Sequence, residues 1–310
     1  MSARFQRAAA AFPLTRGRAR REARELFDIV AGFTYSQITL GCVRLGLLER
    51  LRSAPAREAD LLAAMAMPAA AAVTLLRAAA ALELVESVRL EGAAAWALGR
   101  RGSALLGNPG VLAMIEHHAV LYADLVDPLA MLRAPRGSTA LAGYWPYASA
   151  ATPGDVAAGR TTDYTRLMSA SQGLVADEIL DAVDVSACRR VLDVGGGDGT
   201  FLRALATRAP RAQLMLFDLP GVAEQAGHRF AAAGLAMRTE IFAGDFSRDP
   251  LPTGADLISF VRVLHDHDDP RVEVLLRAAN RALVPGGRLL VAEPLAGTPG
   301  AERMGDAYFG

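Results

Sequence analysis

The sequence predicts an α/β protein with two domains, a mainly helical one over residues 1–155 and one built on a parallel sheet over residues 156–310. Up to about residue 150 the apolar residues recur at intervals of three and four, which is the spacing of amphipathic helices. From about residue 185 short apolar strands alternate with helical stretches, the order that builds a parallel sheet with helices on both faces.

Composition limits the class of protein. Lys plus Arg and Asp plus Glu are equal at 33 each, so no overall charge attracts nucleic acid or anionic lipid. The two cysteines, Cys42 and Cys188, lack metal-ligand spacing and fit a reducing compartment. No signal-peptide segment and no uninterrupted apolar run of about 18 residues is present, so we expect a cytoplasmic protein. The basic segment 16–24 favours a solvated helix start over a peripheral membrane contact.

The N-terminal half shows the element order of a winged helix. Helical spacing over 25–51 is followed by a short helix over 57–65 and by a second helix that Pro68 opens, since proline is tolerated in a first turn. The segment 88–102 is extended, with Gly92 at the expected hairpin.

Winged helices often bind DNA, so that function has to be weighed. A recognition helix needs several polar and basic side chains, whereas the helix after Pro68 offers only Arg77. Its apolar face favours burial against a partner subunit. We therefore expect a homodimer through this domain and no nucleic-acid partner, and a ligand-sensing regulator stays the less favoured alternative.

The segment 110–133 predicts a further helix. His117, His118 and Tyr122 lie on or near its apolar stripe, either as satisfied surface or core residues or as a wall of a substrate pocket. A loop rich in Gly, Pro, Ser and Thr follows over 134–154 and joins the two halves. Its exposed-type aromatics include Trp145, a further candidate for the pocket.

The motif VLDVGGGDGTFL begins the second half and indicates a nucleotide-like cofactor. Gly195, Gly197 and Gly199 follow the first strand and precede a helix, so the backbone can turn tightly and approach a ligand. The spacing differs from the dinucleotide form because Thr200 stands where the last glycine would be. Asp193 at the strand end disfavours a pyrophosphate and a nicotinamide-dependent oxidoreductase, and favours S-adenosylmethionine, which is cationic and carries no phosphate.

The next two strands end in residues that suit the same cofactor. Asp218, followed by Leu219, can accept hydrogen bonds from ribose hydroxyls. Asp245 can accept from an adenine amino group while Phe246 packs on the ring. Turn glycines and helix-capping aspartates would explain each feature alone but not their order along the sheet edge.

The run VLHDHDDP (263–270) follows the fourth strand and places His265 at the same sheet edge. A neutral imidazole can accept a proton at cytoplasmic pH. A metal site is the alternative, but His265 and His267 would share a face only if the strand continued, whereas Asp268 and Asp269 before a proline indicate a turn and a helix cap. We therefore expect no metal, and the role of His267 stays open.

With these motifs the chain resembles the class I methyltransferases, and within them the two-domain small-molecule O-methyltransferases typified by plant caffeate and acetylserotonin enzymes. The resemblance covers nearly the whole chain and implies a winged-helix dimerisation domain followed by a Rossmann-like cofactor domain. The segments NPGVLAMIEHHAVLYADLVDP, YWPYA and MGDAYFG are similar to the bacterial hydroxyneurosporene, or demethylspheroidene, O-methyltransferases of carotenoid synthesis.

The resemblance implies methyl transfer from S-adenosylmethionine to a hydroxyl of an apolar substrate such as a 1-hydroxycarotenoid, with phenolic or polyketide metabolites as alternative acceptors. It implies His265 as general base, Glu293 as the carboxylate that orients it, and Asp266 as support for local structure or the cofactor edge. It also implies cofactor contacts at Asp218, at Asp245 with Phe246 and at Arg262, and places Met168, in TDYTRLMSASQ, near cofactor and substrate.

The chain departs from the family pattern at its end. Members of the family continue past the fifth strand with a helix and a final antiparallel strand pair that carries another catalytic glutamate, whereas this sequence stops at Gly310. We expect these C-terminal strands to be missing, with an unpaired sheet edge and a partly open pocket.

Overall fold

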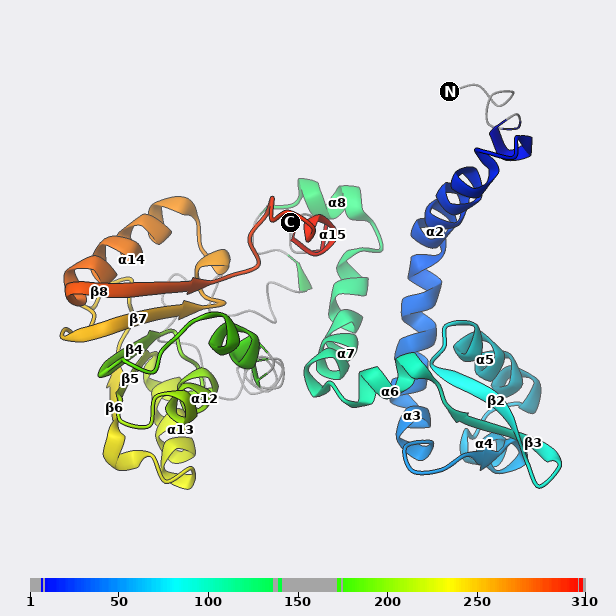
Figure 1. Ribbon diagram of the computed structural model, residues 1–310, viewed down its shortest axis with the longest axis horizontal. Helices are drawn as coiled ribbons and strands as arrows, with labels where there is room; N and C mark the ends of the chain where they lie inside the picture. Colours follow the sequence, from blue (N-terminus) through cyan, green and yellow to red (C-terminus); the bar gives the residue numbers. More distant parts are fainter. Residues whose placement is uncertain are drawn as a thin grey trace. The chain divides into compact units, whose positions relative to one another are not determined.

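The computed structural model, shown in Figure 1, describes residues 7, 9–135, 139–140, 172–173, 175–305 and 307–308. The chain forms two compact units, Met1–Glu116 and His117–Gly310, here called the N-terminal and C-terminal units. The predicted boundary between residues 155 and 156 falls outside the described residues and stays a prediction.

The N-terminal unit is a winged helix, as predicted. A three-stranded antiparallel sheet has the order β1-β3-β2, and β2 and β3 are joined at Glu91 and Gly92, whose φ angles are 52° and 84°. Two positive φ angles fit a type I′ turn, and Gly92 adopts its angle without strain. The strand β1 was not predicted, because two residues carry no pattern. The elements are α2 (Arg16–Arg44), α3 (Leu47–Arg50), β1 (Ala56–Arg57), α4 (Glu58–Ala64), α5 (Ala69–Ala81), β2 (Val85–Leu90), β3 (Ala93–Leu98) and α6 (Arg100–Leu106).

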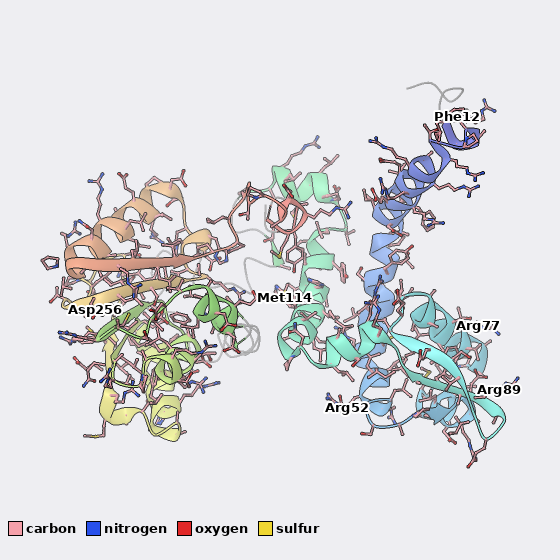
Figure 2. All side chains as sticks on the ribbon, in the orientation of Figure 1. Phe12, Arg52, Arg77, Arg89, Met114 and Asp256 are labelled. Carbon is pink, nitrogen blue, oxygen red and sulfur yellow. The ribbon has the colours of Figure 1, made fainter. Side chains whose placement is uncertain are left out.

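The apolar face of α5 packs inside its own unit. Ala72, Leu76 and Ala79 are fully buried in one cluster with Leu47 and Trp96. The expectation that this face meets a partner subunit was therefore wrong, because the wing and α3 already cover it. Figure 2 shows Arg77 on the opposite, exposed side of α5.

The exposed apolar surface of this unit lies on α2 instead. Leu26, Phe27, Ile29, Val30 and Phe33 are each between 62% and 73% exposed. By length and composition alone α2 could cross a membrane, and only 11% of its most apolar window is buried. An exposed apolar patch of this size is unfavourable in water, so we expect another surface to pack against α2.

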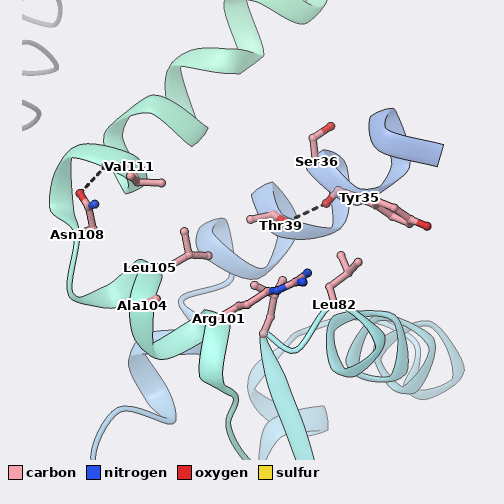
Figure 3. Close-up of a pocket in the computed structure, with 10 residues that line it drawn as sticks. Tyr35, Ser36, Thr39, Leu82, Arg101, Ala104, Leu105, Asn108 and Val111 are labelled. Carbon is pink, nitrogen blue, oxygen red and sulfur yellow. Dashed lines mark hydrogen bonds between the residues drawn. The ribbon is translucent and has the colours of Figure 1, made fainter. Parts of the chain in front are cut away.

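A pocket of about 500 Å³ lies beside the C-terminal half of α2. Figure 3 shows the residues that line it. All of its lining comes from the N-terminal unit, including Tyr35 and Thr39 of α2 and Arg101 of α6. It therefore contains none of the residues that the sequence predicts for the site.

The C-terminal unit contains the predicted parallel sheet. Its strand order is β6-β5-β4-β7-β8, and every neighbouring pair is parallel. The chain moves outward from β4 to β6 and then returns to place β7 on the other side of β4. This reversal opens a crevice at the carboxyl ends of β4 and β7, where such sheets bind ligands. The elements are β4 (Arg190–Val194), α12 (Thr200–Arg208), β5 (Gln213–Asp218), α13 (Pro220–Ala232), β6 (Thr239–Ala243), β7 (Ala255–Val261), α14 (Asp269–Ala282) and β8 (Leu283–Ala292).

Two apolar clusters cover the two faces of this sheet. Successive residues of a strand enter different clusters: Leu214 packs with Phe201 and Phe230 on one face, and Met215 packs with Phe260 on the other. Burial on both faces explains why the central strands are continuous apolar runs. The edge strand β8 is less covered, and its Leu289 and Val291 are 41% and 38% exposed.

The helix predicted over 110–133 is broken into α7 (Pro109–Asp124) and α8 (Pro128–Arg133). Asp127 caps α8 by accepting a hydrogen bond from the Ala130 N–H at 2.9 Å, and Pro128 cannot continue the preceding helix. The prediction of one helix was wrong because the apolar periodicity runs on through a cap. The short helix α15 (Glu302–Gly305) lies near the C-terminus.

Gly102 of α6 shows how closely the N-terminal unit is packed. A Cβ on Gly102 would lie 2.1 Å from the Leu84 carbonyl oxygen, whereas a Cβ on Gly107 would meet nothing closer than 3.6 Å. We expect Gly102→Ala to destabilise the chain by about 1–3 kcal/mol through overpacking, and Gly107→Ala to have little effect. Thermal unfolding followed by circular dichroism measures both variants. Equal melting curves would contradict the packing shown here.

Candidate active site

The turn after β4, residues 195–199, is called the glycine turn. Gly195, Gly197 and Gly199 have φ angles of 68°, 60° and 76°, which L side chains rarely adopt. A Cβ on Gly195 would also lie 2.8 Å from a methyl group of Val263. The three predicted glycines are therefore required by backbone conformation, and Gly195 also by its neighbour.

Asp193 lies under the glycine turn. Its side chain is buried, and one oxygen, Oδ1, accepts a hydrogen bond from the Ser259 hydroxyl at 2.6 Å. Burial raises the pKa of Asp193 to about 7, against the bond from Ser259, and the charge of Asp218 raises it further. Its other oxygen, Oδ2, has no hydrogen-bond partner among the described residues, and Gly196 closes over it. A buried carboxylate oxygen that accepts no hydrogen bond destabilises the fold. A hydrogen-bond donor or a positive charge near the glycine turn would offset this cost.

Asp218 joins the ends of β5 and β4. Its Oδ2 accepts from the Gly197 N–H and its Oδ1 from the Leu219 N–H, both at 2.7 Å. Burial raises the pKa of Asp218 to about 6, although both backbone donors lower it. Leu219 is the N-cap of α13 and contributes its N–H to this contact. The predicted ribose carboxylate thus lies beside the glycine turn.

Asp245 and Phe246 follow β6. The Oδ1 of Asp245 accepts from the Ser247 N–H at 2.8 Å, which fixes the turn. The ring of Phe246 meets the ring of His267 edge to face, with 5.3 Å between centroids. His267, whose role the sequence leaves open, therefore packs on the residue predicted to meet the adenine. Burial lowers the pKa of His267, which favours a neutral ring at this apolar contact.

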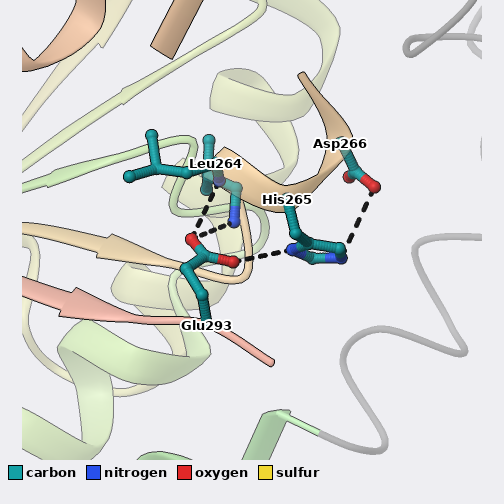
Figure 4. Close-up of polar contacts among 5 residues, drawn as sticks. Leu264, His265, Asp266 and Glu293 are labelled. Atoms are coloured by element: carbon teal, nitrogen blue, oxygen red, sulfur yellow. Dashed lines mark hydrogen bonds and ion pairs between the residues drawn. The ribbon is translucent and has the colours of Figure 1, made fainter. Parts of the chain in front are cut away.

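His265 lies in a short 3₁₀ turn, η4 (Leu264–Asp266), directly after β7. Figure 4 shows the ring of His265 between Glu293 and Asp266. Its Nδ1 lies 2.6 Å from Glu293 Oε2, and its Nε2 lies 3.4 Å from Asp266 Oδ1. Because a carboxylate can only accept, Nδ1 donates and Nε2 of the neutral ring has a lone pair to accept a proton. The structure therefore brings the three predicted residues, His265, Glu293 and Asp266, together.

The carboxylate of Glu293 is itself held by the backbone. Its side chain is 2% exposed, and Oε1 accepts from the N–H groups of Val263 and Leu264, both at 2.8 Å. Successive N–H groups in a turn form a concave anion site. A buried carboxylate with three hydrogen bonds is fixed in position, so it fixes the imidazole in turn.

The charges around His265 favour its protonated form. Burial, the largest single influence, lowers the pKa of His265, but the bond to Glu293 and the charges of Asp266 and Glu293 together raise it above its ordinary value of 6.5. The positive charge of Arg262 lowers the pKa of His265 and so acts against these carboxylates. Burial has the opposite effect on the neighbouring carboxyl group and raises the pKa of Asp266. An imidazolium formed here would be stabilised by its two carboxylate neighbours.

Arg262 has a conformation that sequence reasoning missed. Its φ is 58°, uncommon for a residue with a long side chain, and its N–H donates to the Ala292 carbonyl at 2.9 Å. This left-handed residue redirects the chain so that the next two N–H groups converge on Glu293. No sequence signal marks it, because arginine has no preference for such angles.

The predicted pocket residues are only partly described. His118 Nε2 lies 2.6 Å from the hydroxyl of Tyr308, and the His118 ring packs edge to face on Tyr122 and Tyr308. Burial lowers the pKa of His117 and His118.

Tyr308 was missed, although MGDAYFG carries part of the family resemblance. Burial raises the pKa of Tyr308, the Tyr122 charge raises it further, and the Arg262 charge lowers it, so Tyr308 shares a charged neighbour with His265. Met168 and Trp145 lie outside the described residues, so the structure places neither.

Within the described part of the chain, no group of three or more His, Cys, Asp or Glu side chains could hold a metal ion. His265 and His267 have different partners, Glu293 and Phe246. The glycine turn with Asp193 and Asp218 fits a cationic, phosphate-free cofactor better than a pyrophosphate. S-adenosylmethionine matches because it offers an ammonium group, a sulfonium group and ribose hydroxyls.

Comparisons with known proteins agree with this chemistry. Residues 147–308 match the O-methyltransferase domain family. The chain is 46% identical to the demethylspheroidene O-methyltransferase of Cereibacter sphaeroides over 99% of this chain and 80% of that protein. It is 42% identical to the enzyme of the same name from Rhodobacter capsulatus, over 96% and 72%.

Among solved structures, CalO1, a methyltransferase of calicheamicin biosynthesis with S-adenosylhomocysteine bound, superposes with a TM-score of 0.74 at 26% identity. The match covers 93% of this chain and 85% of that one. Fold, cofactor chemistry and sequence therefore lead to the same conclusion. The chain belongs to the S-adenosylmethionine-dependent O-methyltransferase family.

Proposed function

We propose that the acceptor of the methyl group is a hydroxyl of a long apolar molecule, the tertiary hydroxyl of a 1-hydroxycarotenoid. The observation that carries this proposal is the extent of similarity to two demethylspheroidene O-methyltransferases, which spans 99% and 96% of the chain at 46% and 42% identity. The family and the self-buried face of α5 both argue against a winged-helix regulator of DNA.

His265 is the general base of the proposed reaction. Its Nε2 takes the proton of the acceptor hydroxyl, Glu293 holds the ring through Nδ1, and Asp266 stabilises the imidazolium that forms. An aliphatic alcohol is a much weaker acid than an imidazolium, so the proton leaves as the new carbon–oxygen bond forms. General-base help contributes about a hundred- to ten-thousandfold in rate, and alignment in a site without water supplies much of the rest.

The cofactor is held at the ends of β4, β5 and β6. Asp218 would accept hydrogen bonds from the ribose hydroxyls, and Asp245 would accept one from the adenine amino group, with Phe246 against the ring. Asp193, Leu219 and Arg262 shape this side of the crevice through the contacts described above. When bound, S-adenosylmethionine supplies an activated methyl group on a positively charged sulfur.

The exposed face of α2 supports a homodimer through the N-terminal unit. Its apolar residues, from Leu26 to Phe33, form a continuous helix surface that a second copy would cover. The basic segment 16–24 precedes this surface directly and would suit a peripheral contact with anionic lipid. The dimer is the proposed occupant, and the membrane is the other outcome of the test below.

The acceptor can be tested directly. We expect methyl transfer from labelled S-adenosylmethionine to a 1-hydroxycarotenoid in detergent micelles, with the added mass on the tertiary hydroxyl, and little transfer to simple phenols or polyketides. Mass spectrometry of the products measures both. Turnover of phenols without turnover of the carotenoid would reject the acceptor but not the reaction class. As a control, calorimetry with S-adenosylhomocysteine measures whether the purified protein binds the cofactor.

The base can be tested by two substitutions. We expect His265→Ala to lower kcat by about a hundred- to ten-thousandfold and to leave the affinity for S-adenosylhomocysteine unchanged, because the imidazole acts only on the acceptor. Asp269→Asn, in the first turn of α14 and outside these contacts, is the matched control and keeps the wild-type rate. Unchanged turnover in His265→Ala would reject the assignment.

The pH dependence follows from the raised pKa of His265. Turnover needs the neutral ring, so the rate falls as pH drops through a value above 6.5. In Glu293→Gln the bond that raises this pKa is weakened while burial still lowers it, so the acidic limb of kcat/KM moves to lower pH and the plateau falls. A profile that keeps its midpoint would contradict the role of Glu293.

The dimer can be tested at Phe33, which is 73% exposed. We expect Phe33→Asp to weaken association by about ten- to a hundredfold, since burying such a side chain is worth roughly 1.5–3 kcal/mol. Light scattering after gel filtration measures the mass. Leu132→Asp on α8, where Leu132 is 75% exposed, is the control and leaves the mass unchanged. A monomeric wild type that pellets with anionic vesicles would assign α2 to a membrane instead.

A further inference from the structure

The glycine turn is held from one side by α13. Each of its last three residues has a partner on or directly before that helix: Gly197 contacts Asp218, Asp198 contacts Arg229, and Gly199 contacts Phe230. We propose that Arg229 is a positioning residue for S-adenosylmethionine, which acts by fixing Asp198 and with it the glycine turn.

Asp198 is the central contact. Its side chain is 5% exposed, and Oδ1 accepts from the N–H and the hydroxyl of Thr200 at 3.1 and 2.6 Å. A guanidinium nitrogen of Arg229 lies 2.6 Å from the other oxygen, Oδ2. Removing one partner of a buried charge leaves the other uncompensated, and this is much more costly than losing an exposed ion pair.

Gly199 completes the contact with α13. A Cβ at this position would lie 2.4 Å from the ring of Phe230, so only glycine allows the turn to lie against the helix. Phe230 is itself buried in the sheet core, with 1% exposure. The ring therefore fixes the distance between turn and helix, while Arg229 fixes the orientation of the turn.

The same helix starts at the ribose carboxylate. Asp218 precedes α13 by two residues, and Arg229 and Phe230 lie in its C-terminal part. A helix is a stiff element, so α13 couples the position of Asp218 to that of the glycine turn. Loss of the contact between Arg229 and Asp198 therefore frees the glycine turn and weakens cofactor binding. The Arg229 side chain is 48% exposed, and among the residues that the structure describes it contacts neither His265 nor those proposed for the substrate pocket.

The test is calorimetry of S-adenosylhomocysteine binding to the full chain. We expect Arg229→Ala to raise the Kd by about tenfold and Arg229→Lys to restore part of the loss, because a cation again faces Asp198. Adding Asp198→Asn to Arg229→Ala should bring the Kd back toward wild type, since it removes the uncompensated charge. A merely structural role would lower the melting temperature without this recovery.

A second ion pair provides the matched control. Arg208 on α12 bonds to Asp181 at the same distance, 2.6 Å, and its side chain is similarly exposed, at 45%. We expect Arg208→Ala to leave the Kd within twofold of wild type. If Arg229→Ala also binds normally, if Arg208→Ala weakens binding equally, or if the double variant is worse than Arg229→Ala, the proposal is wrong. Should Arg229→Ala not fold, Arg229→Lys and Asp198→Asn are measured in its place.

Discussion

Carboxylates that link neighbouring strands at the carboxyl edge of the parallel sheet determine the geometry of that edge. Asp218 at the end of β5 binds the turn after β4, Asp193 of β4 binds Ser259 of β7, and Glu293 after β8 binds the turn after β7. Asp218 and Glu293 accept from backbone N–H groups that follow the ends of parallel strands, whereas Asp193 accepts from a side-chain hydroxyl. The glycine turn and His265 are therefore both held by carboxylate contacts, which are repeated across four adjacent strands.

These contacts have an electrostatic consequence. Asp193 and Asp218 are close enough for the charge of Asp218 to raise the pKa of Asp193, and burial raises both. An edge that carries two carboxylates repels phosphate and can bind hydroxyl donors and cations. The charge of these strand ends therefore disfavours a cofactor that carries a pyrophosphate.

The sequence predicted what depends on chain order and periodicity. The alternation of strands and helices was enough to bring Asp218, Asp245 and His265 to one edge, because parallel strands all end on the same side. What it could not predict depends on contacts distant in sequence. The left-handed backbone of Arg262, the bond between His118 and Tyr308, and the orientation of Asp193 toward Ser259 all require the folded neighbour. The break at Asp127 was missed because a helix cap does not interrupt apolar spacing.

Among the described residues, the contacts that hold His265 come from the turn η4 and from Glu293, which follows β8. Glu293 and the N–H groups that hold it belong to the ends of β7 and β8, whereas the aromatic residues His118, Tyr122 and Tyr308 belong to α7 and the C-terminal segment. The proposed proton acceptor and this aromatic cluster thus lie in separate stretches of chain. Exchange of α7 for the corresponding segment of a relative would therefore change the aromatic cluster and leave the contacts between His265 and Glu293 in place.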